Sequence, residues 1–431
     1  MKSIFCIGLG KLGLIFSQIL AEHGYFVYGN DKNPKVQRNI TSNLKDPEPL
    51  LNDLIKKNRK KFIHTKNYKE AISNSFCTFL VLPTPSKKNK EFDNSYIIQS
   101  LMEIGPHLKN KKKYLINITS TVNPGSCNLF IKLLEEKFNL VHGKEFILTY
   151  NPHLIALGSI YNDVMNSDLV IIGSDLKDGS SILKNIYKKL YKKKISKLQY
   201  LNLKEAEISK ISINTYITMK ISYTNTISQI ADVEMGVNTS KILNTIGFDK
   251  RIGHNYLKLG AMYSGPCFPR DNLNFSKYLS NLNLKSKLPL TIDEINNIQI
   301  KRYIKIFKRN LKHLKVKPVI GICGLSYKDK TSLTVHSPGE QLIKYFKHKN
   351  KVVYYDNYAK FNWKDKNCVR IKNLKNFFKL SDVIFVCYKD SNFKTIEKCK
   401  TRDPKIIIDL WNFINTCDKN VKLIKLGISQ I

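Results

Sequence analysis

The sequence predicts an α/β protein in which two Rossmann-like, doubly wound domains are joined by a long central helix and a helical dimerisation region. Three observations lead to this prediction. A short apolar strand near the start runs into a glycine-rich turn and a helix. A second series of short apolar strands begins after Arg302. Between the two series, residues 205–237 carry apolar side chains at helical spacing.

The length of the chain sets the expected number of domains. A chain of 431 residues is too long for one ordinary hydrophobic core. We therefore expect an N-terminal domain over residues 1–198, a central helical domain over 199–300 and a C-terminal domain over 301–431.

The first domain is predicted to bind a dinucleotide. Residues 3–7 form an apolar strand, residues 14–23 have helical spacing and residues 25–28 return to a strand pattern. The intervening turn reads Gly8-Leu9-Gly10-Lys11-Leu12-Gly13. In such a turn the first glycine permits a tight bend, the second admits a pyrophosphate, and the third allows close packing of helix and strand. Asp31 follows about 20 residues on, where it would bind a ribose 2′-hydroxyl, so the pattern favours NAD over NADP.

Two further predicted strands, residues 77–82 and 114–118, end in turn residues that are expected to face the cofactor. Ligands bind beyond the carboxyl ends of strands in a doubly wound sheet. The turn residues expected to contact the cofactor are Pro83, Thr84, Ser120 and Thr121. Strands are also predicted at residues 146–150 and 169–173, and the first of these ends in Asn151-Pro152-His153.

The second series of strands is predicted at residues 319–323, 352–355, 383–386 and 406–408. This region has the pattern of a Rossmann-like domain without the glycine fingerprint, so it need not bind a dinucleotide. A substrate that carries a nucleotide, held between two such domains, is the natural expectation.

The composition is globular, but the net charge is unusual. The chain is 42% hydrophobic and 25% charged, with a formal net charge of +38. A basic excess attracts phosphate and is one mark of a nucleic-acid-binding protein. Here the lysines are scattered through every segment and no arginine-rich aromatic patch occurs, so we expect no nucleic-acid partner. The charge would instead help to attract an anionic substrate.

The cysteines and the hydropathy pattern bear on where the protein works. Nine cysteines are dispersed without CxxC pairs or histidine spacing, which indicates neither a zinc site nor a disulfide framework. Such thiols suit a reducing cytoplasm. The start of the chain lacks an adequate signal-peptide core, and no apolar run approaches the roughly 20 residues that span a bilayer. We expect a cytoplasmic protein that has no membrane partner.

Two segments carry candidate catalytic side chains whose role the residues alone leave open. Cys267 lies in the loop SGPCFPRD, which also contains Asp271. Such a thiol is either an ordinary buried side chain or a nucleophile held on a rigid loop. Lys210 and Asn214 are four residues apart on the predicted long helix and so share one face. A lysine on a helix is more often simply solvated.

Taken together, these motifs resemble those of the UDP-glucose/GDP-mannose dehydrogenase family along nearly the whole chain. The segments that carry the resemblance are IGLGKLG, VLPTP, EFDNSYI, ITSTVNPG, YNP, EAEISKISINTYITMKIS, GFDKRIGHNYLKLGAMYSGPCFPRD and GLSYKDKT. The resemblance implies an N-terminal NAD domain, a central helix that forms a homodimer and a C-terminal domain that holds the nucleotide. It also implies that a nucleotide-sugar alcohol is oxidised to its carboxylate by two successive hydride transfers to NAD.

The resemblance also implies roles for individual residues. Cys267 corresponds to the nucleophile that captures the intermediate aldehyde, a step that suits a thiolate. The other implied catalytic residues are Lys210 and Asn214 for the oxyanion or a water, Asp271 as the partner of Lys210, Thr121 for positioning the water, and His153. The implied substrate-binding residues are Asn151, Lys210, Asn214, Arg251, Tyr263, Gly265, Tyr327 and Lys328, with Arg251 reaching across the dimer.

Several positions depart from the family pattern. The family usually has Asn-Pro-Glu-Phe-Leu-x-Glu-Gly where this chain has residues 151–158, and His153 and Leu157 replace the two glutamates. The first glutamate is often assigned as the base for thioester hydrolysis, and histidine is a competent base near neutral pH. Hydrolysis would then either survive or become slow and leave an acyl-enzyme. Residues 333–338 lack an arginine that the family has, and Ser264 and Pro266 replace small residues before the cysteine.

We therefore expect an NAD-dependent nucleotide-sugar 6-dehydrogenase with UDP-glucose as the default substrate. The alternatives are UDP-N-acetylmannosamine, another UDP-hexose or GDP-mannose as substrate, or a catalytically impaired relative that binds a nucleotide sugar. A hydroxyacid dehydrogenase of the 6-phosphogluconate type would explain the first domain and the helix. It would not explain Cys267 or the second Rossmann-like domain.

Overall fold

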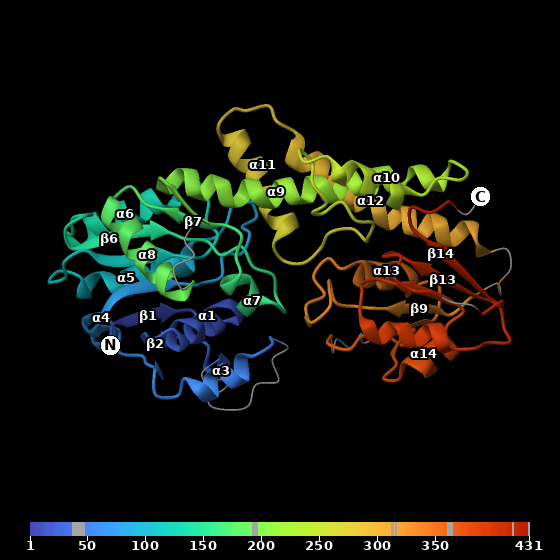
Figure 1. The fold of residues 1–431 in the computed structure, drawn as a ribbon, viewed down its shortest axis with the longest axis horizontal. Coiled ribbons are helices and arrows are strands. Elements are labelled where there is room, and N and C mark those ends of the chain that lie inside the picture. The colour runs from blue at the N-terminus through green and yellow to red at the C-terminus, as the bar shows by residue number, and fades with distance from the viewer. Residues whose placement is uncertain are drawn as a thin grey trace. The chain divides into compact units, whose positions relative to one another are not determined.

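The computed structural model describes residues 1–36, 48–191, 197–311, 314, 317–359, 365–415 and 418–429. These residues fall into two compact units, residues 1–212 and residues 213–431, whose elements are labelled in Figure 1. The two doubly wound sheets predicted from the sequence are both present. The expected division into three domains stays a prediction.

The first unit is built on an eight-stranded sheet. The strand order is β3-β2-β1-β4-β5-β6-β7-β8, and the strands are parallel except at the β6–β7 pair. Its strands are β1 (Ser3–Ile7), β2 (Phe26–Asn30), β3 (Phe62–His64), β4 (Ser75–Leu80), β5 (Tyr114–Ile118), β6 (Phe146–Tyr150), β7 (Val170–Gly173) and β8 (Leu198–Leu201). The direction of winding reverses between β1 and β4, which is the position where doubly wound sheets bind ligands.

Helices cover this sheet in two groups. Helices α1, α7 and α8 pack over one apolar core, whereas α4, α5 and α6 contact one another. The helices are α1 (Lys11–Glu22), α3 (Leu51–Lys57), α4 (Tyr68–Asn74), α5 (Ser95–Ile104) with the 3-10 turn η1 (Gly105–His107), α6 (Ser126–Phe138), α7 (Ile160–Met165) and α8 (Lys177–Leu190).

The long helix predicted between the two sheets is α9 (Leu203–Ser228). The boundary between the two units falls within it. The expected end at residue 237 is wrong, because the helix stops at Ser228 and a short 3-10 turn, η2 (Ile230–Asp232), follows. The guanidinium group of Arg302 explains the stop. It donates to the Ser228 carbonyl oxygen at 2.8 Å and to its hydroxyl at 2.6 Å, so this helix end is bonded to a side chain.

The second unit contains a six-stranded parallel sheet in the order β11-β10-β9-β12-β13-β14. Its strands are β9 (Ile320–Cys323), β10 (Val352–Tyr355), β11 (Cys368–Arg370), β12 (Val383–Val386), β13 (Lys405–Asp409) and β14 (Val421–Lys425). Its helices are α10 (Thr239–Phe248), α11 (Phe268–Asn281), α12 (Leu288–Arg309), α13 (Pro338–Phe346), α14 (Leu374–Leu380) and the 3-10 helix η4 (Ser391–Lys398).

Alternating side chains of these strands fill two cores. Ile322 and Phe385 pack with α12 and α13 on one face, whereas Cys323 and Ile384 pack with α14 and η4 on the other. Figure 1 shows α13 and α14 on opposite sides of the orange and red sheet. Both faces are buried, which is why these strands read as continuous apolar runs. Among the described residues, no helix is long and apolar enough to cross a membrane.

Candidate active site

The glycine turn after β1 is shaped by close backbone contacts. Gly8 has a φ of 90°, and a Cβ there would lie 2.2 Å from the Val81 carbonyl oxygen. A Cβ on Gly13 would lie 1.8 Å from the Gly8 carbonyl oxygen. At Gly10, in contrast, a Cβ would meet nothing within 4 Å. The turn therefore needs Gly8 and Gly13 for its own fold, and it leaves open space beside Gly10 where a pyrophosphate would approach.

Asp31 follows β2 and is tied to this turn. Its Oδ2 accepts a hydrogen bond from the backbone N–H of Leu9 at 2.7 Å, and its Oδ1 accepts one from Asn33 at 2.8 Å. Helix α1 begins at Lys11, and no described side chain caps it. Its first N–H groups are thus left for an anion, while Leu12 packs against the core. This arrangement fits a bound NAD.

The turns after β4 and β5 hold each other in place. The N–H of Leu82 donates to Ser120 Oγ at 2.7 Å, and Thr84 Oγ1 donates to the carbonyl oxygen of Thr121 at 2.7 Å. Pro83 is exposed, Thr84 is buried and Thr121 is half-buried. These four predicted cofactor contacts thus lie together at the carboxyl ends of neighbouring parallel strands.

Glu207, which the sequence analysis did not single out, anchors the segment that carries Thr121. Its carboxylate accepts the N–H of Gly125 at 2.5 Å and that of Cys127 at 2.8 Å, at the start of α6. Glu207 is fully buried, and burial raises its pKa although these two N–H groups act in the opposite direction. The available signal was its place on α9, three residues before Lys210 and on the same face.

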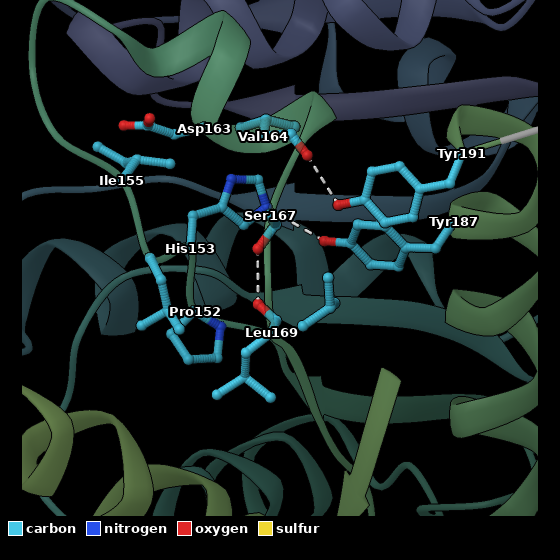
Figure 2. A pocket seen from close by; sticks show the side chains of 11 residues that line it. Pro152, His153, Ile155, Asp163, Val164, Ser167, Leu169, Tyr187 and Tyr191 are labelled. Atoms are coloured by element: carbon cyan, nitrogen blue, oxygen red, sulfur yellow. Dashed lines mark hydrogen bonds between the residues drawn. The ribbon is translucent and has the colours of Figure 1, made fainter. Parts of the chain in front are cut away.

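His153 lies in a small pocket within the first unit, on the segment after β6 (Figure 2). Its ring packs edge-on against Phe16 of α1, with ring centroids 4.4 Å apart. Its Nε2 is 3.3 Å from the hydroxyl oxygen of Tyr187, on α8. Burial, and to a lesser extent the charge of Lys210, lowers the pKa of His153 to about 4. His153 is therefore a neutral side chain held against apolar neighbours.

The other predicted residues of this segment also make internal contacts. Asn151 is buried, and its side chain donates to the Ile171 carbonyl oxygen at 2.6 Å and accepts from Tyr187 at 2.5 Å. Leu157 packs against the apolar core beneath α1, α7 and α8. The leucine that replaces the second family glutamate is thus an apolar anchor for the segment.

The candidate nucleophile Cys267 stands at the amino end of α11 and is exposed. A helix amino terminus favours negative charge, and the thiolate is the reactive form of cysteine. The loop before it is fixed by Gly265, which has a φ of 87° and donates its N–H to the Val335 carbonyl oxygen at 2.9 Å. A Cβ on Gly265 would lie 2.8 Å from the Tyr327 ring, so these two predicted substrate contacts touch.

Asp271 lies in the first turn of the same helix and is fully buried. Its Oδ2 accepts from the side-chain amide of Asn214, on α9, at 2.6 Å. Its Oδ1 accepts from Arg270 Nη2 at 2.8 Å. The next residue, Asn272, accepts hydrogen bonds from the hydroxyl groups of Thr215 and Thr218 on α9. The helix that carries Cys267 is therefore bonded to the helix that carries Asn214.

Lys210 and Asn214 lie one turn apart on α9, the former in the first unit and the latter in the second. Both side chains are buried, with relative exposures of 8% and 7%. The common reading of a helical lysine as a solvated side chain therefore does not apply to Lys210.

The remaining predicted substrate contacts lie in the second unit. The Tyr263 hydroxyl donates to Asp293, and burial raises the pKa of Tyr263. Lys328 is half-buried, with its Nζ 5.9 Å from the Tyr327 ring centroid. Arg251 is exposed and forms an ion pair with Asp249 at 2.6 Å.

The second sheet repeats the strand order of the first up to β6, and it repeats the turn as well. Gly324 follows β9 with a φ of 100°, and a Cβ on Gly339 would lie 2.3 Å from its carbonyl oxygen. Asp356 follows β10 and accepts the N–H of Leu325 at 2.7 Å. These three residues correspond to Gly8, Gly13 and Asp31.

The two acidic residues differ in how far their oxygens are occupied. Asp356 is buried and also accepts the N–H groups of Ser326, Tyr358 and Ala359, at 2.6 to 2.7 Å. Both oxygens of the Asp356 carboxylate thus accept hydrogen bonds from backbone N–H groups of the protein itself. This supports the prediction that the second sheet need not bind a dinucleotide.

Comparison with known families matches three models along the chain. All three belong to the UDP-glucose/GDP-mannose dehydrogenase family: its NAD binding domain over residues 2–191, its central domain over 204–298 and its UDP binding domain over 321–416.

Individual relatives and one solved structure are similar over nearly the whole length. The UDP-glucose 6-dehydrogenase of Rickettsia typhi is 27% identical over 432 residues, covering 96% of each chain. The GDP-mannose 6-dehydrogenase of Pseudomonas savastanoi pv. phaseolicola is 26% identical and also covers 96% of each. A UDP-glucose dehydrogenase structure from Pyrobaculum islandicum has a TM-score of 0.87 at 21% identity, covering 100% of this chain and 98% of that one, and so shares the fold.

Proposed function

The chain belongs to the UDP-glucose/GDP-mannose dehydrogenase family and is an NAD-dependent oxidoreductase, and we propose that it oxidises a nucleotide sugar at C6 to the uronic acid. UDP-glucose is the substrate we propose by default. The observation that carries the proposal is the exposed Cys267 at the amino end of α11, whose first turn is bonded to Asn214 through the buried Asp271. A thiol held in this way suits capture of an aldehyde.

The residues around the glycine turn would hold the cofactor. The open space beside Gly10 and the uncapped start of α1 accommodate the pyrophosphate, and Asp31 takes the ribose hydroxyl groups. When bound, NAD accepts one hydride in each of the two oxidation steps. The two hydrogen-bonded turns that carry Thr84 and Thr121 lie along the same edge of the sheet.

Cys267 provides the covalent step between the two oxidations. Its thiolate adds to the carbonyl carbon of the aldehyde to form a thiohemiacetal, so the aldehyde does not escape. Loss of the second hydride leaves a thioester. Water then adds to the thioester carbon, the carbon–sulfur bond breaks, and the carboxylate and the Cys267 thiolate are released. The net change per sugar is four electrons removed and one water consumed.

The polar residues stabilise the charges and transfer the protons in these reaction steps. Lys210 and the Asn214 amide stabilise the developing oxyanion or orient the water, as fixed donors do in other acyl-transfer sites. Asp271 exchanges protons with Lys210, and Thr121 positions the hydrolytic water. His153 takes the role of the base for hydrolysis. The nucleotide sugar is held by Asn151, Arg251, Tyr263, Gly265, Tyr327 and Lys328 together with Lys210 and Asn214.

The choice of sugar and nucleotide is the finer part of the proposal. The relatives are named for UDP-glucose in one case and GDP-mannose in another, at 27% and 26% identity. UDP-N-acetylmannosamine and GDP-mannose are therefore the alternative substrates. The match of residues 321–416 to the family's UDP binding domain model supports a nucleotide sugar as substrate.

We also propose a cytoplasmic homodimer that forms through α9. Tyr216 and Tyr223, seven residues apart on α9, are 56% and 46% exposed, and Ile230 just beyond the helix is 39% exposed. Residues seven apart lie on one helix face, and an exposed apolar stripe of this kind is typical of an interface. In the proposed dimer Arg251 reaches the partner's substrate. The cytoplasm is the compartment that suits dispersed cysteines.

A second candidate is a relative that carries out the oxidations but releases the product slowly. The observation that favours it is the packing of His153 against Phe16 together with its lowered pKa of about 4. A base with such a low pKa takes a proton from water less readily than one near neutrality. Slow hydrolysis would leave an acyl-enzyme on Cys267.

One experiment separates these candidates. The protein is incubated with NAD and, in separate samples, UDP-glucose, UDP-N-acetylmannosamine and GDP-mannose, while NADH formation and the intact protein mass are followed. Two NADH per sugar without a retained adduct supports the dehydrogenase. A trapped adduct on Cys267 supports slow release. If NAD binds but no sugar yields NADH, both candidate functions are wrong. A Cys267→Ser variant that keeps four-electron turnover would refute the nucleophile.

A further inference from the structure

The hydrogen bonds behind His153 determine which of its ring nitrogens carries the proton. They form a chain that starts at a backbone carbonyl group of β7 and ends at the imidazole. Each link has a donor and an acceptor, so the identity of the first group decides all the others. All of these groups belong to the first unit. Figure 2 shows the side chains of His153 and Tyr187.

The first link fixes the orientation of Asn151. Its side chain is 2.6 Å from the carbonyl oxygen of Ile171. A carbonyl oxygen can only accept, so the amide nitrogen of Asn151 must face it. The amide oxygen of Asn151 therefore faces the other way, toward α8. There it lies 2.5 Å from the Tyr187 hydroxyl group.

The second and third links follow from the first. An amide oxygen can only accept, so the Tyr187 hydroxyl donates its one hydrogen to Asn151. Toward His153 the oxygen of that hydroxyl can therefore only accept a hydrogen bond. The Nε2 atom of His153, 3.3 Å away, must donate and so carries the ring proton. A neutral imidazole has one N–H, which leaves Nδ1 as the atom with the free electron pair.

The Nδ1 atom has no protein partner among the described residues, although it is buried. The other polar groups of the pocket are engaged elsewhere. The Tyr191 hydroxyl donates to the Val164 carbonyl oxygen at 2.8 Å, and the Ser167 hydroxyl donates to that of Leu169 at 2.7 Å. Oδ2 of Asp163 accepts from the N–H of Ala156 and the hydroxyl of Ser159. A buried acceptor without a partner is rare, and a bound water is its usual complement.

We propose that Asn151 and Tyr187 are positioning residues that hold His153 in the Nε2-protonated tautomer, and that Nδ1 binds a water molecule in this pocket. The inference deepens the proposed function, on which its catalytic consequence rests. In hydrolysis, Nδ1 would take a proton from the attacking water while the water oxygen bonds to the thioester carbon. The carbon–sulfur bond then breaks, and the imidazolium later returns the proton to solvent.

The test reads the tautomer directly and does not depend on turnover. Protein labelled with ¹⁵N and ¹³C in its histidines is studied by two-bond ¹H–¹⁵N correlation, which shows which ring nitrogen is protonated. A His153→Gln variant identifies the His153 signals among the nine histidines. In the unmodified protein near pH 7, we expect a neutral ring with the proton on Nε2. A proton on Nδ1 of the unmodified protein would overturn the proposal.

Two matched tyrosine variants test the relay. Tyr187→Phe removes the hydroxyl next to His153. Tyr191→Phe removes a hydroxyl of the same pocket, one residue beyond the end of α8, that bonds only to Val164 in the described contacts. We expect Tyr187→Phe to give a mixture of tautomers or the other tautomer, and Tyr191→Phe to leave the spectrum unchanged. Unchanged His153 signals in Tyr187→Phe, or the same change in both variants, would refute the role of Tyr187.

Kinetics then connect the tautomer to the reaction. In Tyr187→Phe, single-turnover release of the sugar acid should slow by about 10-fold or more, since general base catalysis contributes roughly 10²- to 10⁴-fold. The KM for the nucleotide sugar should change little. If no sugar yields NADH, the proposed function fails while the tautomer result still stands. If turnover is normal but Nδ1 carries the proton, the relay alone is wrong.

Discussion

The side-chain amide of Asn214 on α9 donates a hydrogen bond to Oδ2 of Asp271 on α11 at 2.6 Å, and the Asp271 carboxylate is fully buried. This contact joins the central helix to the first turn of the helix that begins beside Cys267. The pair was expected to act in catalysis. The geometry shows that it holds the first turn of α11 against α9, because a buried carboxylate needs its donors.

We expect Asn214→Ala to destabilise the second unit. The change leaves Asp271 Oδ2 without this donor, and an unsatisfied buried group costs about 1–3 kcal/mol, more when it is charged. Urea denaturation followed by circular dichroism measures the effect. Thr226→Ala is the control, since Thr226 is exposed on the same helix and bonds within it. Equal stability of the two variants would contradict a structural role for the Asn214 amide.

The two glycines at the start of α1 should respond in opposite ways to substitution. Gly10→Ala places a methyl group in open space, so the free energy of unfolding should change by less than about 0.5 kcal/mol. The same methyl group would occupy the space proposed for the pyrophosphate, so NAD affinity should fall about 10-fold or more, or roughly 1.4 kcal/mol. Gly13→Ala instead meets the Gly8 carbonyl oxygen and should destabilise the first unit itself.

Calorimetric titration with NAD and thermal melts of both variants check this pair. Normal NAD affinity in Gly10→Ala would show that the dinucleotide does not approach there. Normal stability of Gly13→Ala would contradict the expected clash between the new methyl group and the Gly8 carbonyl oxygen.

Glu207 should behave as an anchor for the segment that carries Thr121. Glu207→Gln keeps the size of the side chain but turns one of its acceptor oxygens into a donor facing the N–H of Gly125 or Cys127. We expect a loss of about 1–3 kcal/mol. Hydrogen exchange of residues 119–127 should become faster. Glu205→Gln, an exposed change two residues earlier on α9, should leave that exchange unchanged. Equal exchange in both variants would refute the anchor.

The sequence was sufficient for the parts of the fold that depend on local pattern. The glycine turn, β1 and the apolar strands β5, β6, β10 and β12 were predicted with correct bounds because buried parallel strands are continuous apolar runs. The three-residue edge strands β3 and β11 were missed, since edge strands are short and need little apolar surface. The end of α9 was missed because Arg302, far along the chain, bonds to its last carbonyl oxygen.

The candidate site shows the same limit. The family resemblance implied roles for Cys267 and Asp271, but sequence spacing does not show which side chains a buried carboxylate will bond to. Glu207 and Tyr187 were missed for this reason, since both act through contacts that the fold creates. The second copy of the nucleotide turn was also hidden, because the loop of residues 326–337 separates Gly324 from Gly339.

The lowered pKa of His153 has a consequence for stability that is independent of catalysis. Its pKa falls from an ordinary value of 6.5 to about 4 in the folded chain, through burial first and then the charge of Lys210. Between these two values the unfolded chain binds a proton on His153 and the folded chain does not. Protonation therefore favours the unfolded state, and stability is lost as the pH falls from about 6.5 toward 4.

We therefore expect His153 to contribute about 2 kcal/mol of the stability lost between pH 7.5 and pH 5, at about 1.4 kcal/mol for each pH unit below its ordinary pKa of 6.5. His153→Gln should remove this part of the slope, as measured by urea denaturation at a series of pH values. An unchanged slope in His153→Gln would mean that the ring is protonated as readily in the folded chain as in the unfolded one. The imidazole would then be as well solvated in its charged form as in the unfolded chain, and it could not be the buried, neutral group that the contacts with Phe16 and Tyr187 describe.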